Sequence, residues 1–139
     1  MPYVAERRLL EELARSDSQN AFNLDFRHTC FFSCDVHFSA GDLVITNPPF
    51  GPTLATGANI WANGKVDKSA SFIDAIIQRS EPGVEIVAIL PDSLLSGPRY
   101  RKWREHVASN MVDLAVFRWG RFSKDADIDV FILNGTITE

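Results

Sequence analysis

The chain has 139 residues, of which 45% are hydrophobic and 23% charged, a composition typical of one globular domain. Its 14 lysines and arginines stand against 18 aspartates and glutamates, a net charge of −4, which excludes a uniformly basic nucleic-acid-binding surface. With no apolar run of membrane-spanning length and no signal-peptide pattern, we expect a soluble, cytoplasmic protein.

The first predicted elements are a helix and two strands. Four apolar residues recur at helical spacing over residues 3–14, and the polar residues 16–20 end that helix. Residues 30–38 alternate like a strand, and residues 42–46 have the β-branched content of a buried one.

Two cysteines and two histidines lie close together in residues 28–37 and raise the question of a metal site. In a strand, alternation places Cys30, Cys34 and His28 on one face and turns His37 to the other. A closed zinc site usually draws on two separated ligand pairs. We therefore expect no metal and interpret the cysteines as reduced thiols in a core strand.

The most informative stretch is residues 42–51, Asp-Leu-Val-Ile-Thr-Asn-Pro-Pro-Phe-Gly. The prolines end the strand and form a stiff elbow at its carboxyl end, where open α/β sheets bind ligands. We expect this strand to be central and parallel. The Asn47 side-chain oxygen and the Pro48 carbonyl would accept both hydrogens of a planar amine, and Phe50 would stack on the ring that carries it. The alternative interpretation is that the Asn-Pro and Pro-Pro pairs only form an ordinary turn.

The next segment, residues 51–68, is predicted to be a long loop without secondary structure. Loops of this length inside compact domains are usually functional or disordered, so we expect a mobile lid beside the elbow. Trp61 would contact a nucleobase or anchor the loop, and we favour the anchor.

The remaining elements alternate between helix and strand. A helix is predicted at 69–80 with Ser69 as cap, a strand at 84–90, a helix at 98–109 opened by Pro98, and strands at 112–117 and 128–133. This order indicates one α/β domain over residues 1–139, with a mostly parallel sheet and a C-terminal antiparallel pair. Two basic clusters, residues 99–104 and 118–124, are interpreted as solvated faces in preference to phosphate contacts.

Three segments in this order resemble the amino-group DNA methyltransferases, especially the adenine-specific enzymes of restriction–modification systems. They are the strand and Asn-Pro-Pro-Phe elbow, the Leu-Pro loop within residues 85–97, and the aromatic residue and strand of residues 122–133. The resemblance covers residues 30–134 and implies a partial class I S-adenosylmethionine-dependent, Rossmann-like methyltransferase fold.

The resemblance also implies an activity, the transfer of a methyl group from S-adenosylmethionine to the exocyclic amine of a flipped adenine in DNA. The implied catalytic residues are Asn47, Pro48, Pro49 and Phe50. Phe50 and Phe122 would sandwich the extruded base.

On the cofactor side the resemblance implies a smaller set. Asp35 would meet the adenine amine of S-adenosylmethionine, with Asp25 as the competing candidate, and Phe72 would pack on the cofactor's adenine ring or serve only as a core residue. The glycine-rich turn of the family is absent, since the first glycine is Gly41. The chain therefore resembles the C-terminal, catalytic-motif portion of the domain. We expect it to bind S-adenosylmethionine weakly or not at all by itself.

Two alternatives to DNA methylation remain open as the function of this chain. Similar elbows serve methylation of RNA bases and of protein glutamine amides, because these substrates also present a planar amine. The chain would otherwise be a catalytically silent accessory or scaffold domain of a restriction–modification complex. In each case the missing strands would leave an exposed sheet edge that invites self-association or a partner subunit.

Overall fold

A computed structural model describes residues 11, 25, 27, 29–57 and 59–139, and divides the chain into two units, residues 1–30 and 31–139. In the first unit, Arg27 forms an exposed ion pair with Asp25 at 2.7 Å. The helix predicted over residues 3–14 lies outside the described residues, apart from Glu11. The single domain over residues 1–139 therefore stays a prediction.

The second unit is built on a four-stranded sheet with the strand order β1-β4-β6-β5. Its strands are β1 (Leu43–Thr46), β4 (Glu85–Pro91), β5 (Met111–Arg121) and β6 (Asp129–Ile137). β1 and β4 run parallel, whereas β6 is antiparallel to both β4 and β5. The predicted α/β class and the antiparallel C-terminal pair are confirmed. The last strand lies between its two neighbours rather than at the edge of the sheet.

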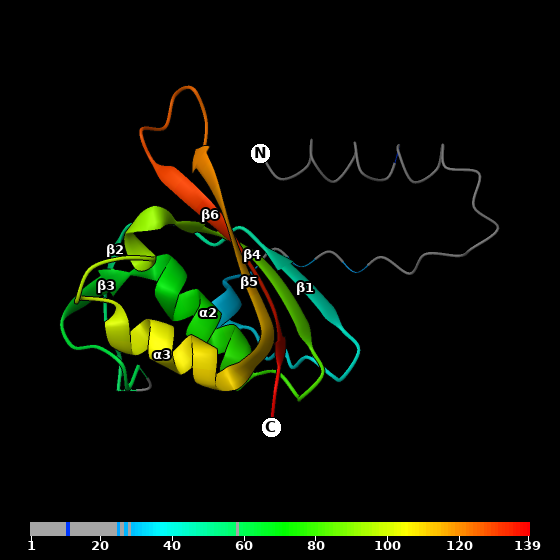
Figure 1. Cartoon of the computed structure of the whole chain (residues 1–139). Coiled ribbons are helices and arrows are strands. Elements are labelled where there is room, and N and C mark those ends of the chain that lie inside the picture. Colours follow the sequence, from blue (N-terminus) through cyan, green and yellow to red (C-terminus); the bar gives the residue numbers. More distant parts are fainter. Residues whose placement is uncertain (1–10, 12–24, 26, 28, 58) are drawn as a thin grey trace. The chain divides into compact units, whose positions relative to one another are not determined.

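Two helices cover one face of this sheet (Figure 1). They are α2 (Lys68–Gln78) and α3 (Arg101–Asn110). Alternate residues of the strands point into the core between sheet and helices, among them Ile86, Leu90 and Phe131, each at most 1% exposed. Ile73 and Trp103 fill the helix side of the same core.

The other sheet face and the β1 edge are open among the described residues. Leu43 is 55% exposed and Ile45 is 74% exposed, although both belong to a strand. β4 is the only described strand that pairs with β1. The prediction of a central strand before the elbow is therefore wrong for this part of the chain, where β1 is an edge strand.

The prediction of a strand over residues 30–38 is also wrong. Phe31–Ser33 form a short 3-10 helix, η1, and only Phe38 makes a bridge, to Ser80. Arg79 holds the segment in this shape by donating to the carbonyl oxygens of Phe31 (2.8 Å) and Phe32 (3.2 Å). Cys30 is exposed and Cys34 half-buried, so they are not thiols of a core strand.

The segment 51–68 is not the structureless loop that the sequence predicts. β2 (Pro52–Leu54) and β3 (Lys65–Asp67) form an antiparallel hairpin. Trp61, in the connection between them, is 4% exposed and belongs to the core, as the anchor interpretation expects. Asp67 rather than Ser69 caps α2, because its carboxylate accepts the Ser69 N–H at 2.9 Å. α3 begins three residues after the predicted Pro98, at Arg101.

A buried polar network joins the hairpin connection to both helices. Asp74 of α2 is 1% exposed. One of its carboxylate oxygens accepts a hydrogen bond from Asn59 Nδ2, and the other binds His106 Nε2, each at 2.8 Å. Because both carboxylate oxygens have partners, the buried polar groups are satisfied. The network ties α2, α3 and the connection between β2 and β3 together.

Candidate active site at the carboxyl edge of the sheet

The elbow, residues 47–50, follows the carboxyl end of β1. Asn47 and Pro49 are exposed, Pro48 is buried and Phe50 is half-buried. No described group hydrogen-bonds to the Asn47 side chain, and none donates to the Pro48 carbonyl oxygen. Since β1 and β4 are parallel, their carboxyl ends meet at the same edge. The elbow thus has two acceptors without described partners at this edge, one on the exposed Asn47 and one on the buried Pro48.

Hydrogen bonds from the neighbouring hairpin fix the far end of the elbow. Gly51 has a φ of 112°, a backbone conformation that side-chain-bearing residues rarely adopt. Its N–H donates to Asp67 Oδ2 at 3.1 Å, and its carbonyl accepts the Lys68 N–H at 2.7 Å. The Asp67 N–H donates in turn to the Tyr100 hydroxyl at 2.9 Å. The elbow is therefore anchored to the amino ends of both helices.

The structure brings Phe122 to Phe50. Their ring centroids lie 6.0 Å apart with the planes at 69°, an edge-to-face contact. Phe122 sits where the β5–β6 hairpin opens into its loop, and its N–H donates to the Ile128 carbonyl at 2.9 Å. This hairpin extends beyond the rest of the sheet (Figure 1). Because the rings touch each other, they do not form the open sandwich that the sequence predicts. A base would enter only if Phe122 moved away from Phe50.

The sequence reading missed a carboxylate at the same edge. Asp92 follows the carboxyl end of β4, and its Oδ2 lies 3.7 Å from Arg118 Nη2 on β5. Arg121 likewise pairs with Asp127 at 3.0 Å. The signal was present, since Asp92 comes two residues after the buried strand predicted at 84–90. Two of the three cations of the second basic cluster are thus paired, Arg121 within the hairpin and Arg118 with the residue that follows β4.

The residues predicted for the cofactor lie around η1 and α2. Phe72 stacks on Phe31 (centroids 5.1 Å apart, planes at 20°) and meets Phe32 edge-on at 4.6 Å. Asp35 is exposed and pairs with His37 at 3.1 Å. Asp25 belongs to the other unit, so its place relative to this site is not defined.

These residues fit S-adenosylmethionine only in part. The Asp35 carboxylate and the half-buried Phe72 ring suit an adenine, but Phe31 already covers one face of that ring. Among the described residues before β1, Gly41 is the only glycine, so this part of the chain offers no glycine-rich turn for the methionine end. The described residues therefore do not form a complete cofactor site, and we assign no chemical step to such a site in this chain.

Comparison with known proteins identifies the fold. No family model matches the chain, and no curated protein does. Among solved structures, it is similar to a protein from Listeria monocytogenes described as a candidate class I S-adenosylmethionine-dependent methyltransferase. The TM-score is 0.57 and the identity 16%, over 76% of this chain and 34% of that one. The chain thus has a class I methyltransferase-like α/β fold, and it spans about a third of the length of this neighbour.

One further structural finding concerns membranes. Among the residues that the structure describes, no helix is long and apolar enough to cross a bilayer.

Proposed function

We propose that this chain carries the substrate-binding elbow of an S-adenosylmethionine-dependent methyltransferase that acts on the exocyclic amine of adenine in DNA. One observation carries the proposal: the exposed Asn47 amide and the Pro48 carbonyl, both without described partners, lie at the carboxyl edge of a class I methyltransferase-like sheet. The Phe50–Phe122 pair beside them supports an aromatic substrate.

The elbow suits the chemistry of a planar amine. The lone pair of an adenine amino group is delocalised into the ring, which makes the nitrogen a poor nucleophile. If Asn47 Oδ1 and the Pro48 carbonyl each accept one amine hydrogen, they favour a tetrahedral nitrogen and localise its lone pair. A nitrogen held in this way would be able to accept a methyl group, and one amine proton would leave to water. S-adenosylmethionine supplies the methyl group when bound.

The aromatic pair would hold the base outside the double helix. An amine stacked in a duplex cannot reach the elbow in line, so the adenine must be extruded. Stacking on an aromatic ring contributes about 1–3 kcal/mol per base, which helps to offset the unstacking. For this role the β5–β6 hairpin has to shift, because Phe122 now touches Phe50 edge-on.

DNA is the proposed substrate because the Leu-Pro-Asp segment at the end of β4 resembles the corresponding segment of the DNA enzymes. The experiment that tests the proposal uses the protein together with any polypeptide that copurifies with it. It measures the transfer of a labelled methyl group from S-adenosylmethionine to duplex DNA, to RNA and to a glutamine-containing peptide. We expect label in DNA as N6-methyladenine. Label in RNA or peptide alone would assign the elbow to another substrate, and no label in any of them would support a silent accessory domain.

We also propose that a second polypeptide, a partner subunit or another copy of this chain, covers β1. The open edge of β1 and the exposed Leu43 and Ile45 support this, because unpaired apolar edge strands pair readily with other chains.

The isolated chain is therefore expected to associate rather than remain monomeric, and to bind S-adenosylmethionine weakly or not at all. Ile45→Lys places a charge on the open face and should shift sedimentation toward the monomer. Leu54→Lys is the matched control, since Leu54 is 70% exposed but lies on β2, outside the main sheet. A monomeric native chain that binds S-adenosylmethionine with micromolar affinity in calorimetry would contradict both expectations.

A further inference from the structure

A basic cavity lies between the β2–β3 hairpin and the start of α3. It has a volume of about 470 Å³ and is lined by residues 60–63, 65–66 and 98–102. Four of these residues are cationic, and none carries a carboxylate: Lys65, Arg99, Arg101 and Lys102. In a chain with a net charge of −4, four cations lining one cavity concentrate positive potential at one place.

The walls of the cavity are preformed. Tyr100 is 8% exposed, and its hydroxyl accepts the Asp67 N–H at 2.9 Å. Arg99 donates through Nη2 to the Lys65 carbonyl oxygen, which joins the hairpin side of the cavity to the helix side. Arg101 forms an ion pair with Glu105 at 3.3 Å, in which both side chains are more than half exposed. An exposed pair of this kind is worth little and leaves the guanidinium able to bind another anion.

One buried hydrogen-bond donor of the cavity wall lacks a described acceptor. Trp61 lines the cavity and is 4% exposed, yet no described group accepts a hydrogen bond from its indole Nε1–H. α3 begins beside the cavity without a side-chain cap and without an acidic residue in its first turn. The helix dipole therefore adds to the positive potential of the four side chains. The cations, the helix start and the unpaired indole N–H together suit a ligand with several anionic oxygens.

The cavity is physically connected to the elbow. Asp67 binds Gly51, the residue after the elbow, through its carboxylate and Tyr100 of the cavity wall through its N–H. Lys65 pairs with Leu54 at the other end of β2, three residues after Gly51. At about 3.3 Å per residue this is a separation of about 10 Å, so a nucleic-acid strand bound at the elbow would have neighbouring phosphates within reach of the cavity.

We propose that this cavity binds phosphate groups of the nucleic-acid backbone that flank the base held at the elbow. The inference rests on the proposed function, and it deepens that function by giving the substrate a second contact. The phosphates would fix the position of the strand, whereas Asn47 would engage the base, a division usual in nucleic-acid recognition. The interpretation of residues 99–104 as only a solvated face is thereby replaced.

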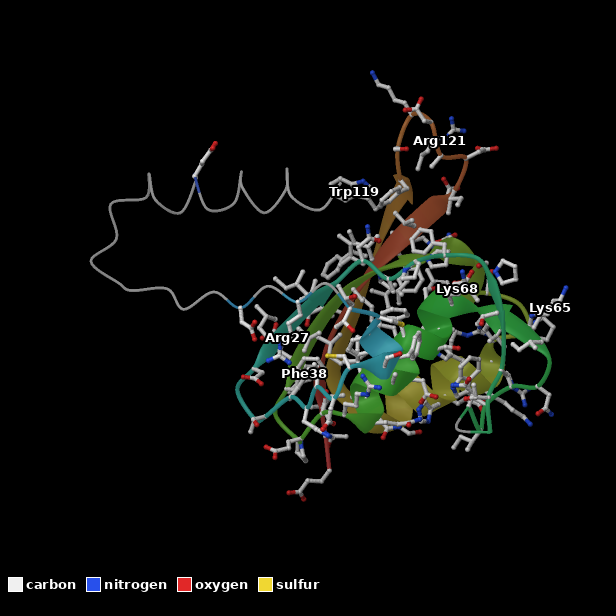
Figure 2. The ribbon with its side chains drawn as sticks, turned by 180° about the vertical axis from the view of Figure 1, so that it is seen from behind. Arg27, Phe38, Lys65, Lys68, Trp119 and Arg121 are labelled. Atoms are coloured by element: carbon white, nitrogen blue, oxygen red, sulfur yellow. The ribbon has the colours of Figure 1, made fainter. Side chains whose placement is uncertain are left out.

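The test measures binding of a fluorescein-labelled, adenine-containing single-stranded oligonucleotide to the full chain by anisotropy over a series of salt concentrations. Lys65→Gln and Lys102→Gln are each expected to weaken binding about 3- to 10-fold at low salt, and to reduce the slope of log K against log salt by about 0.7 per lost phosphate contact. Lys124→Gln is the matched control. It removes the same charge from the β5–β6 loop, and the hairpin that leads into this loop carries Trp119 and Arg121 well away from Lys65 (Figure 2).

The outcomes separate the possibilities. Equal losses in all three variants, or no loss in the two cavity variants, would overturn the proposal. Displacement of the oligonucleotide by micromolar pyrophosphate would also overturn it, in favour of a site for a small free phosphate compound. Because this experiment measures binding and not methyl transfer, failure of the cavity proposal is distinguishable from failure of the proposed function. Binding that depends on the two lysines but is not accompanied by methylation would support the phosphate site at the cavity and would leave the function of the elbow unassigned.

Discussion

Replacing Asn47 with alanine is expected to reduce the turnover number of the assembled enzyme by about 100- to 1000-fold, the usual effect of losing one preorganised group that stabilises the transition state. The amide is exposed and has no described partner, so its removal should leave the fold unchanged. The affinity for the oligonucleotide should change little, because the acceptor acts mainly in the transition state. Single-turnover kinetics and anisotropy on the same preparation measure the two quantities.

Asn47→Asp is the control for this prediction. It keeps an acceptor oxygen of the same size at the same position, so it should retain more turnover than Asn47→Ala. Equal losses of rate and of nucleic-acid affinity in both variants would show that Asn47 has a structural role instead.

Replacing Trp103 with alanine is expected to lower the free energy of unfolding by about 3–5 kcal/mol, the usual cost of removing a large buried aromatic side chain. Trp103 is 2% exposed between α3 and the sheet, and its indole N–H donates to the Ala70 carbonyl of α2 at 3.2 Å. Since domains of this kind are stable by about 5–15 kcal/mol, the variant should be largely unfolded under mild denaturing conditions. Urea titration followed by circular dichroism measures the loss.

Trp119→Ala is the matched control for the second prediction. Trp119 is 71% exposed on β5, so the same substitution there should change the free energy of unfolding by about 0.5 kcal/mol or less. Similar losses at both positions would mean that α3 is not packed on the sheet as the structure shows.

Local sequence patterns predicted the helix and the strand in which one side of the element is buried in the core and the apolar residues therefore recur at a regular spacing. The apolar stripe over residues 69–80 gave α2, whose Ile73 and Ile76 face the core, and the apolar run over 84–90 gave β4. The strand predicted at 30–38 failed because tertiary contacts decided its conformation. Arg79 and Phe72, from another part of the chain, contact Phe31 and hold it in η1.

The candidate site was predictable at the elbow and less so around it. Two prolines after a β-branched run fix the end of β1 from local sterics alone. The edge-to-face contact of Phe50 with Phe122, the pairing of Asp92 with Arg118 and the basic cavity all require strand order and register, which a single sequence does not specify. The β2–β3 hairpin was missed because strands of three residues carry too short a pattern to recognise.

The most direct test of the central claim is a crystal structure of the assembled protein with a short adenine-containing DNA. We predict an extruded adenine with its exocyclic nitrogen about 2.7–3.2 Å from both Asn47 Oδ1 and the Pro48 carbonyl oxygen, the range of ordinary hydrogen bonds. The base should lie against Phe50, with Phe122 displaced from its present edge-to-face contact. A DNA complex in which every adenine stays stacked, or in which an extruded base binds away from residues 47–50, would contradict the account.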